Sequence, residues 1–213
     1  VAHAAGFSTS SVCDAAHRTV VLGAATAGLA APHQLLRKGS FNKDDIAIVD
    51  PAQQHNYQPG WTLVGGGIKT REDFTRPMKQ LIDPKLRFYQ DAATQVRAKD
   101  NTVVTQSGEE LTYEQLIVTT GYNITLDSIP GLREALYKPN PKVVSIYTYD
   151  TVDKVFPAIE ALKEGDAIFT QPASPIKCAG APQKIMWLAV DLWKKAGLFD
   201  KDPAKSKIHV TFA

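Results

Sequence analysis

The clearest hydrophobic pattern lies near the start of the chain and predicts a strand, a turn, a helix and a second strand. A β-branched apolar run over 18–22 leads into a glycine-rich turn over 23–28. A helical stretch follows to about Lys38, with Gly39 as its C-cap. A second apolar strand over 45–49 ends in Asp50. This order, closed by an acidic residue, is typical of a dinucleotide-binding βαβ unit.

Each part of this motif has a physical reason to be there. Gly23 permits the tight turn after the strand, and Gly28 lets the helix pack closely on it. The N-terminus of the helix directs unpaired N–H groups and partial positive charge at a pyrophosphate. Asp50 is predicted to accept hydrogen bonds from ribose hydroxyls. It lies 27 residues after Gly23, beyond the typical interval of about 20, and the loop over 39–44 accounts for the excess.

Two residues depart from the usual motif. Ala25 stands where the fingerprint has its second glycine, so its methyl group is expected to crowd the phosphates. Pro32 falls inside the predicted helix, where it removes a backbone donor and typically costs about 3 kcal/mol. Both residues are expected to weaken nucleotide binding.

The middle of the chain predicts a ligand-facing loop and a small antiparallel insert. The segment 57–67 is aromatic and rich in glycine, and Tyr57 and Trp61 could either contact a ligand or serve in packing. Short alternating segments at 88–94, 102–105 and 110–111 predict the insert. A buried strand over 113–120 then returns to the main sheet and ends at Gly121.

A second strand, turn and helix unit follows, and it carries a cysteine where a nucleotide fingerprint would stand. A helix over 151–163 precedes a strand over 166–170, a proline-rich loop and a helix from about Pro182 to Lys195; a further strand runs from Ile208. Cys178 lies beside Lys177 and just ahead of this helix, two features that favour thiolate over thiol. The alternative is that Cys178 is a small buried hydrophobic residue.

Composition excludes several other classes of protein. The chain has 213 residues, of which 44% are hydrophobic and 22% charged, which is ordinary for a globular protein. The formal charge of +2 includes no long run of either sign, so no nucleic-acid partner is predicted. Cys13 and Cys178 are too far apart in sequence to suggest a disulfide framework or a metal site. No apolar stretch approaches the roughly 18 residues of a membrane-spanning helix.

The first residues suggest a processed or disordered tail. Residues 1–11 are rich in Ala and Ser and contain no acidic residue, as in transit peptides, although they also lack arginine. A short N-terminal tail of no consequence is the alternative. No role is predicted for Cys13.

Three motifs together resemble the mitochondrial sulfide:quinone oxidoreductases. They are HNYQPGWTLVGGG at 55–67, TTG at 119–121 and PIKCAGAPQKIM at 175–186. The resemblance extends from about Arg18 to Ala213, and the cysteine-bearing loop is what separates this family from NADH dehydrogenases of the same fold.

The resemblance implies an α/β fold of the FAD/NAD(P)-binding Rossmann-like, three-layer flavoprotein type, truncated, with a small antiparallel insert. Its implied divisions are a tail over 1–17, an FAD-binding domain over 18–148, and the start of a second, NAD-like domain over 149–213.

It also implies the site. FAD would be bound by Gly23, Ala25, Gly28, Asp50 and Gly121, and Cys178 would be the first of two redox cysteines that oxidise sulfide to protein-bound sulfane sulfur. Electrons would pass through FAD to quinone, and a small thiol or sulfite would accept the sulfur. The complete protein is expected at the mitochondrial inner membrane, as a peripheral protein. The second cysteine and the quinone pocket are not among the 213 residues, so this chain alone is expected to be inactive.

Two alternatives remain open on the sequence. A truncated or diverged, non-catalytic member of the family would explain Ala25 and Pro32. An NADH:quinone oxidoreductase of the same fold would need a second glycine fingerprint after Thr170, and the segment 171–182 contains none.

Overall fold

The computed structural model describes residues 15–139, 142–171 and 176–213, and the chain forms two compact units. The first unit comprises 1–56 and 76–122, and the second comprises 57–75 and 123–213. The segment 57–75 therefore belongs to the same compact unit as the later residues. The domain boundary expected at 148 stays a prediction. Cys13 and most of the predicted tail lie outside the described residues.

Ten strands and five α-helices are assigned within the described part of the chain. The strands are β1 (Ala15–Leu22), β2 (Ile46–Val49), β3 (Gln54–Asn56), β4 (Thr75–Pro77), β5 (Arg87–Tyr89), β6 (Ala93–Arg97), β7 (Thr102–Thr105), β8 (Glu110–Val118), β9 (Gly165–Phe169) and β10 (Ile208–Phe212). The helices are α1 (Thr26–Lys38), α2 (Trp61–Gly65), α3 (Leu132–Tyr137), α4 (Val155–Ala161) and α5 (Ala181–Lys195).

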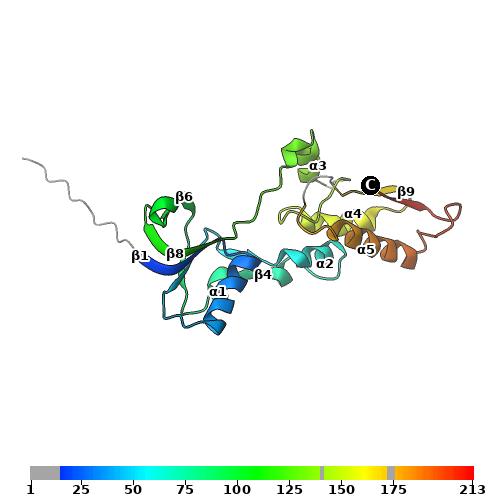
Figure 1. The fold of residues 1–213 in the computed structure, drawn as a ribbon. Helices are drawn as coiled ribbons and strands as arrows, with labels where there is room; N and C mark the ends of the chain where they lie inside the picture. The colour runs from blue at the N-terminus through cyan, green and yellow to red at the C-terminus, as the bar shows by residue number, and fades with distance from the viewer. Residues whose placement is uncertain (1–14, 140–141, 172–175) are drawn as a thin grey trace, which may run out of the picture. The chain divides into compact units, whose positions relative to one another are not determined.

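The first unit is built on a six-stranded sheet in the order β5-β2-β1-β8-β7-β6. Figure 1 labels β1, β8 and β6 of this sheet. The four strands β5, β2, β1 and β8 are parallel, whereas β7 is antiparallel to β8 and β6 is antiparallel to β7. A parallel sheet with an antiparallel edge, entered through a βαβ unit, is the predicted Rossmann-like α/β fold with its antiparallel insert.

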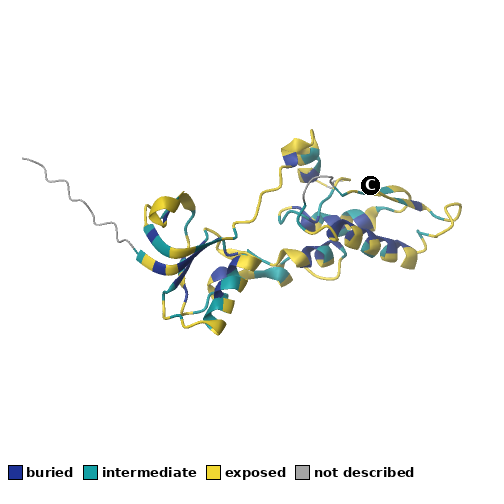
Figure 2. Ribbon diagram, in the orientation of Figure 1, coloured by how far each residue is buried: buried dark blue, intermediate teal, exposed yellow. Residues whose placement is uncertain are grey.

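The central strands are buried on both faces, which explains their nearly continuous apolar sequence. Alternate side chains point to opposite faces, so Val20 and Leu22 belong to one apolar cluster while Val21 belongs to another. The Val21 cluster is covered by Leu29, Leu35 and Leu36 of α1. β2 is buried throughout and β1 is buried from Thr19 to Leu22. Figure 2 shows buried residues of the first unit in dark blue.

Four predicted elements of this unit differ from the structure. The predicted strand 88–94 is two strands, because β5 continues the parallel sheet and β6 belongs to the antiparallel edge. The segments 110–111 and 113–120 are one strand, β8, which pairs with β7 at its start and with β1 along its length. β8 is only partly buried, and β1 begins at Ala15, three residues earlier than expected.

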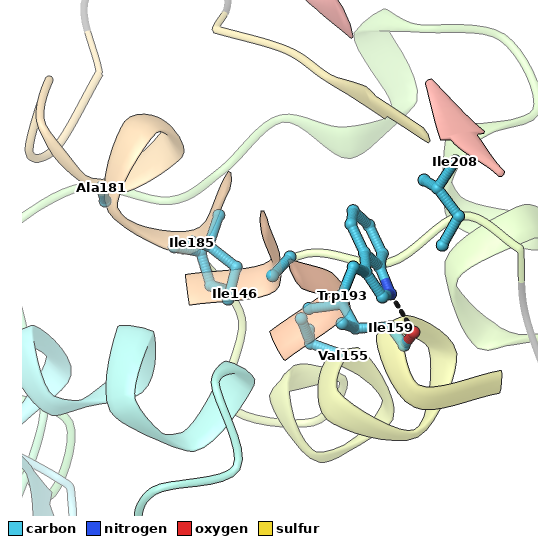
Figure 3. Packing of buried hydrophobic residues seen from close by; sticks show 8 residues of the cluster. Ile146, Val155, Ile159, Ala181, Ile185, Trp193 and Ile208 are labelled. Atoms are coloured by element: carbon cyan, nitrogen blue, oxygen red, sulfur yellow. Dashed lines mark hydrogen bonds between the residues drawn. The ribbon is translucent and has the colours of Figure 1, made fainter. Parts of the chain in front are cut away.

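The second unit contains a parallel pair, β9 and β10, with the helices α4 and α5. Its largest apolar cluster joins residues of both helices and of β10 around Trp193 (Figure 3). The indole Nε1 of Trp193 donates a hydrogen bond of 2.9 Å to the carbonyl oxygen of Ile159, so α5 is tied to α4 inside the cluster.

The glycine-rich segment after Tyr57 is helical, and the expected ligand-facing loop is not seen there. It forms a 3₁₀ turn over 58–60 followed by α2. Trp61 is buried with Val64 and Val152, so its role is packing, the second of the two interpretations that the sequence left open.

Candidate functional site

The ends of three parallel strands meet at the predicted nucleotide site. Leu22, the last residue of β1, is in register with Val49 at the end of β2 and with Val118 at the end of β8. The residues that follow these strands are therefore neighbours at one edge of the sheet. In doubly wound sheets, ligands bind at this edge, where neighbouring strands connect in opposite directions.

The turn after β1 requires glycine at two positions. Gly23 has φ +90°, and a Cβ there would lie 2.6 Å from the carbonyl oxygen of Thr119. A Cβ on Gly28 would lie 1.7 Å from the carbonyl oxygen of Gly23. The sequence predicted both requirements, a tight turn and close packing between helix and strand.

Thr119 locks this turn, a role that the sequence did not predict. Its hydroxyl lies 2.9 Å from the carbonyl oxygen of Leu22 and 3.0 Å from that of Gly23, and its single hydrogen is shared between these two acceptors. Only its place in the TTG motif, directly after a strand, distinguishes Thr119 in the sequence.

The N-terminus of α1 is open toward solvent. Ala25 is its N-cap residue, no side chain caps the helix, and its first turn has no acidic residue. Ala25, Thr26 and Ala27 are all exposed. Ala25 has φ −73°, which any residue adopts, so this position does not need glycine for its backbone conformation. Pro32 lies inside α1 as predicted, and the helix continues past it to Lys38.

Asp50 holds the turn as well as the loop that follows β2. Its Oδ2 accepts a hydrogen bond of 2.6 Å from the backbone N–H of Ala24, and its Oδ1 accepts one of 2.7 Å from that of Ala52. Each oxygen retains a second lone pair, so the predicted bond to a ribose hydroxyl is still available.

His55 is a further neighbour of the turn that the sequence did not assign. Its Nδ1 lies 3.3 Å from the carbonyl oxygen of Ala24, to which it can only donate. His55 follows β2 by a few residues, and its place in the HNYQPGW motif was the only signal available.

Gly121 is the last of the predicted nucleotide-binding residues in the sequence. It has φ +71° and is exposed, and no atom lies within 4 Å of a Cβ built on it. Its glycine is therefore required by conformation alone, two residues after Thr119.

These residues fit a dinucleotide. The uncapped helix end supplies backbone donors for phosphate, the two glycines keep the turn tight, and Asp50 offers carboxylate oxygens. The structure thus brings together Gly23, Ala25, Gly28 and Asp50, with Gly121 on the segment that follows β8.

Cys178 belongs to the second unit and lies in the loop before α5. It is an exposed free cysteine, so the alternative interpretation, a small buried hydrophobic residue, is wrong. Its φ is +78°, a conformation that non-glycine residues rarely adopt. The backbone N–H of Ala181, the first residue of α5, donates to its carbonyl oxygen at 3.1 Å.

The ammonium of Lys177 has partners other than the neighbouring thiol. It donates to Oε1 of Gln58 and, at 3.0 Å, to the carbonyl oxygen of Tyr147. It also lies 4.6 Å from the centre of the Trp61 ring. Burial among these groups lowers the pKa of Lys177. The predicted influence of its charge on Cys178 stays a prediction.

Two other kinds of site are not found in the described residues. No group of three or more His, Cys, Asp or Glu side chains there could hold a metal ion. No helix in the same part of the chain is long and apolar enough to cross a membrane.

Comparisons with known proteins place this chain in a family. Residues 17–159 match the family model described as pyridine nucleotide-disulphide oxidoreductase. The mitochondrial sulfide:quinone oxidoreductase of Schizosaccharomyces pombe is 39% identical over 92% of this chain and 44% of its own length. That of Dictyostelium discoideum is 43% identical over 86% of this chain and 40% of its own length.

A solved structure shows the same fold. The sulfide:quinone oxidoreductase of Aquifex aeolicus aligns with a TM-score of 0.67 and 20% identity over 92% of this chain and 42% of that one. The chain thus spans less than half the length of the relatives it matches.

Proposed function

Because the chain belongs to the pyridine nucleotide-disulphide oxidoreductase family, we propose that it is the N-terminal part of a sulfide:quinone oxidoreductase. In this reaction, sulfide loses two electrons and is converted to protein-bound sulfane sulfur, and quinone gains both electrons. The observation that carries the proposal is the exposed Cys178 in the loop between β9 and α5. The identity to sulfide:quinone oxidoreductases of two organisms supports it.

We propose that FAD is held by the turn of the first unit. The open N-terminus of α1 would bind the pyrophosphate, with Gly23, Ala25 and Gly28 forming the turn beneath it. Asp50 would bind the ribose, and Gly121 would line the site from the end of β8. Bound FAD supplies a two-electron carrier between the sulfur chemistry and quinone.

Cys178 would supply one sulfur of the reacting pair. A thiolate or disulfide sulfur at this position must be reachable by sulfide, and the side chain of Cys178 is exposed. The second cysteine of the pair would come from outside the 213 residues, as would the quinone site. A small thiol or sulfite would then accept the sulfane sulfur from the protein.

The names of the relatives support a location in mitochondria. The relatives from Schizosaccharomyces pombe and Dictyostelium discoideum are named mitochondrial. We propose a mitochondrial location for this protein, with peripheral association of the complete protein with the inner membrane, where quinone is available.

An NADH:quinone oxidoreductase is the weaker alternative. A second nucleotide site would need a glycine turn between β9 and α5, and the segment 171–180 contains Gly180 as its sole glycine.

Sulfide-dependent quinone reduction by the protein of the complete reading frame tests the role of Cys178. Cys178→Ser should abolish the activity while bound FAD is retained, and Cys13→Ser should leave the activity intact. Undiminished activity of Cys178→Ser would reject this role.

Flavin titration of the 213-residue chain tests the nucleotide site. Asp50→Asn should weaken FAD binding about tenfold, because it removes a charged acceptor. Asp45→Asn, at the opposite end of the same strand, is the matched control and should bind FAD normally. Equal affinity of both variants would argue against the assigned ribose contact.

A further inference from the structure

The backbone of Cys178 is held in a conformation that its own chemistry does not favour. Among the described residues other than glycine, positive φ occurs at Asp44, Asn101 and Cys178. Asp and Asn tolerate this region because their short polar side chains bond locally, whereas cysteine has no such compensation. Such conformations persist only where surrounding contacts enforce them.

Tyr147 supplies one of those contacts. Its hydroxyl donates a hydrogen bond of 3.0 Å to the carbonyl oxygen of Cys178. That oxygen also accepts from the N–H of Ala181, so the peptide group after Cys178 is fixed from two directions.

Lys177 fixes the peptide chain on the other side of Cys178. Its ammonium is half-buried and donates both to Oε1 of Gln58 and to the carbonyl oxygen of Tyr147. It also lies against the faces of Trp61 and Tyr147, with 4.6 Å and 5.7 Å to the ring centres. Trp61 is itself 4% exposed, so the ring that the Lys177 ammonium contacts is buried.

We propose that Tyr147 and Lys177 are positioning residues that hold Cys178 in the left-handed conformation and thereby fix the direction of the Cα–Cβ bond that carries its thiol. The proposal rests on the proposed function, in which this sulfur reacts. Attack on a disulfide depends on which sulfur is approached and on access to it, so a fixed Cα–Cβ bond restricts the positions from which the Cys178 sulfur can react.

The proposal predicts that the strain at Cys178 depends on the two residues. Cys178→Gly relieves positive-φ strain, so it should change the folding equilibrium constant in favour of the folded state. This change should be larger by a factor of about five or more in the wild-type background than in Tyr147→Phe/Lys177→Met. The additional freedom of glycine in the unfolded chain is the same in both backgrounds and cancels. All three tryptophans (Trp61, Trp187 and Trp193) lie in the second unit, so urea unfolding followed by tryptophan fluorescence reports on that unit.

A matched pair in the same unit controls for the loss of a tyrosine hydroxyl and a lysine. Tyr137 donates to Oδ2 of Asp150, and Lys154 donates to the carbonyl oxygens of Leu136 and Lys138. In Tyr137→Phe/Lys154→Met, Cys178→Gly should act as it does in the wild type. Equal effects of Cys178→Gly in all three backgrounds would mean that Tyr147 and Lys177 serve only in packing, and would overturn the proposal.

A second readout does not depend on unfolding. In the folded chain, a residue with positive φ gives a strong intraresidue NOE between its HN and Hα, and Cys178 should show this signal. The signal should weaken in the single variants Tyr147→Phe and Lys177→Met, and an unchanged NOE in both would contradict the positioning role. Neither readout uses sulfide, so this proposal can fail while Cys178→Ser still abolishes activity, and the reverse.

Discussion

A methyl group on Gly28 would lie 1.7 Å from the carbonyl oxygen of Gly23, so replacement must separate α1 from β1. Gly28→Ala should lower the free energy of unfolding by about 3 kcal/mol, the upper end for an overpacked core. Gly121→Ala meets no atom and carries only its positive φ, so it should cost about 1 kcal/mol. Urea unfolding followed by far-UV circular dichroism measures both values.

Gly180→Ala is the control for these substitutions. Gly180 has φ −86°, and an added Cβ would only meet the flexible end of Lys184 at 3.7 Å. Its cost should stay within about 1 kcal/mol. A loss for Gly28→Ala no larger than that for Gly180→Ala would contradict the close packing of helix and strand.

Asp91 is expected to make the stability of the first unit depend on pH. The hydrogen bonds that Ser107 donates to Asp91 lower the pKa of this carboxyl from its usual 3.8 to about 2. A lowered pKa stabilises the fold above pH 3.8, and this contribution is lost as the pH falls toward 2. The urea midpoint of the wild type should therefore exceed that of Asp91→Asn at pH 6, and the difference should shrink between pH 4 and pH 2.

Ser107→Ala checks the cause of this effect. It removes the hydroxyl but keeps the backbone N–H that lies 3.0 Å from Oδ2 of Asp91. In Ser107→Ala, the urea midpoint should therefore keep part of the pH dependence that it has in the wild type. Identical pH profiles for wild type and Asp91→Asn would show that this carboxylate is not stabilised in the fold.

The roles of single residues could be predicted where a short sequence motif determines the local backbone conformation. Gly23 and Gly28 are such cases, since their spacing after a strand specifies the turn. The environment of Lys177 could not be predicted, because Gln58 lies 119 residues away in the sequence. The positive φ of Cys178 was hidden for the same reason, since its restraint comes from Tyr147.

At the scale of elements, the contact between α4 and α5 depends on one indole. Trp193→Phe removes the donor to Ile159 and part of the buried volume, so it should cost about 2 kcal/mol. Trp187, on the same helix, is 62% exposed, and Trp187→Phe should stay within about 0.5 kcal/mol. Far-UV circular dichroism during urea unfolding compares the two, and equal losses would mean that neither the buried hydrogen bond nor the buried volume of the Trp193 indole stabilises the fold.

Elements with strong periodicity were predicted nearly to the residue, and those set by pairing partners were not. α5 was expected from about Pro182 and begins at Ala181, because a proline near the helix start and an apolar face mark it clearly. The segment 88–94 reads as one alternating strand, yet its two halves pair with different neighbours. Hydrophobic alternation records that a segment is extended but not which strand lies beside it.

For the whole molecule, the sequence predicted the Rossmann-like fold but not the way in which the chain is shared between units. The second unit takes 57–75 from within the first part of the chain. This segment was read as a loop of the nucleotide site, because its glycines and aromatics are equally compatible with a ligand and with a packed helix. Only the contacts of α2 with later residues, such as Val155 and Ile185, resolve the choice.

This sharing predicts that the chain can be split without losing the second unit. Co-expressed fragments 1–122 and 123–213 should purify together, because the first supplies α2 to the second. Val64→Asp places a charge in the buried face of α2 and should abolish this association. Tyr57→Ser, at an exposed position, is the control, and a fragment 123–213 that purifies alone would contradict the arrangement.

The same sharing sets an order of events during synthesis. The residues of α2 leave the ribosome 120 residues before those of α5 begin, counting from position 61 to position 181. At about 5–20 residues per second, α2 is made between about 6 and 24 seconds before α5, whose Ile185 and Leu188 lie against Gly65 and Gly66 at the end of α2. During that interval the apolar face of α2 lacks the side chains of α5 that cover it in the folded chain, so α2 is accessible to chaperones.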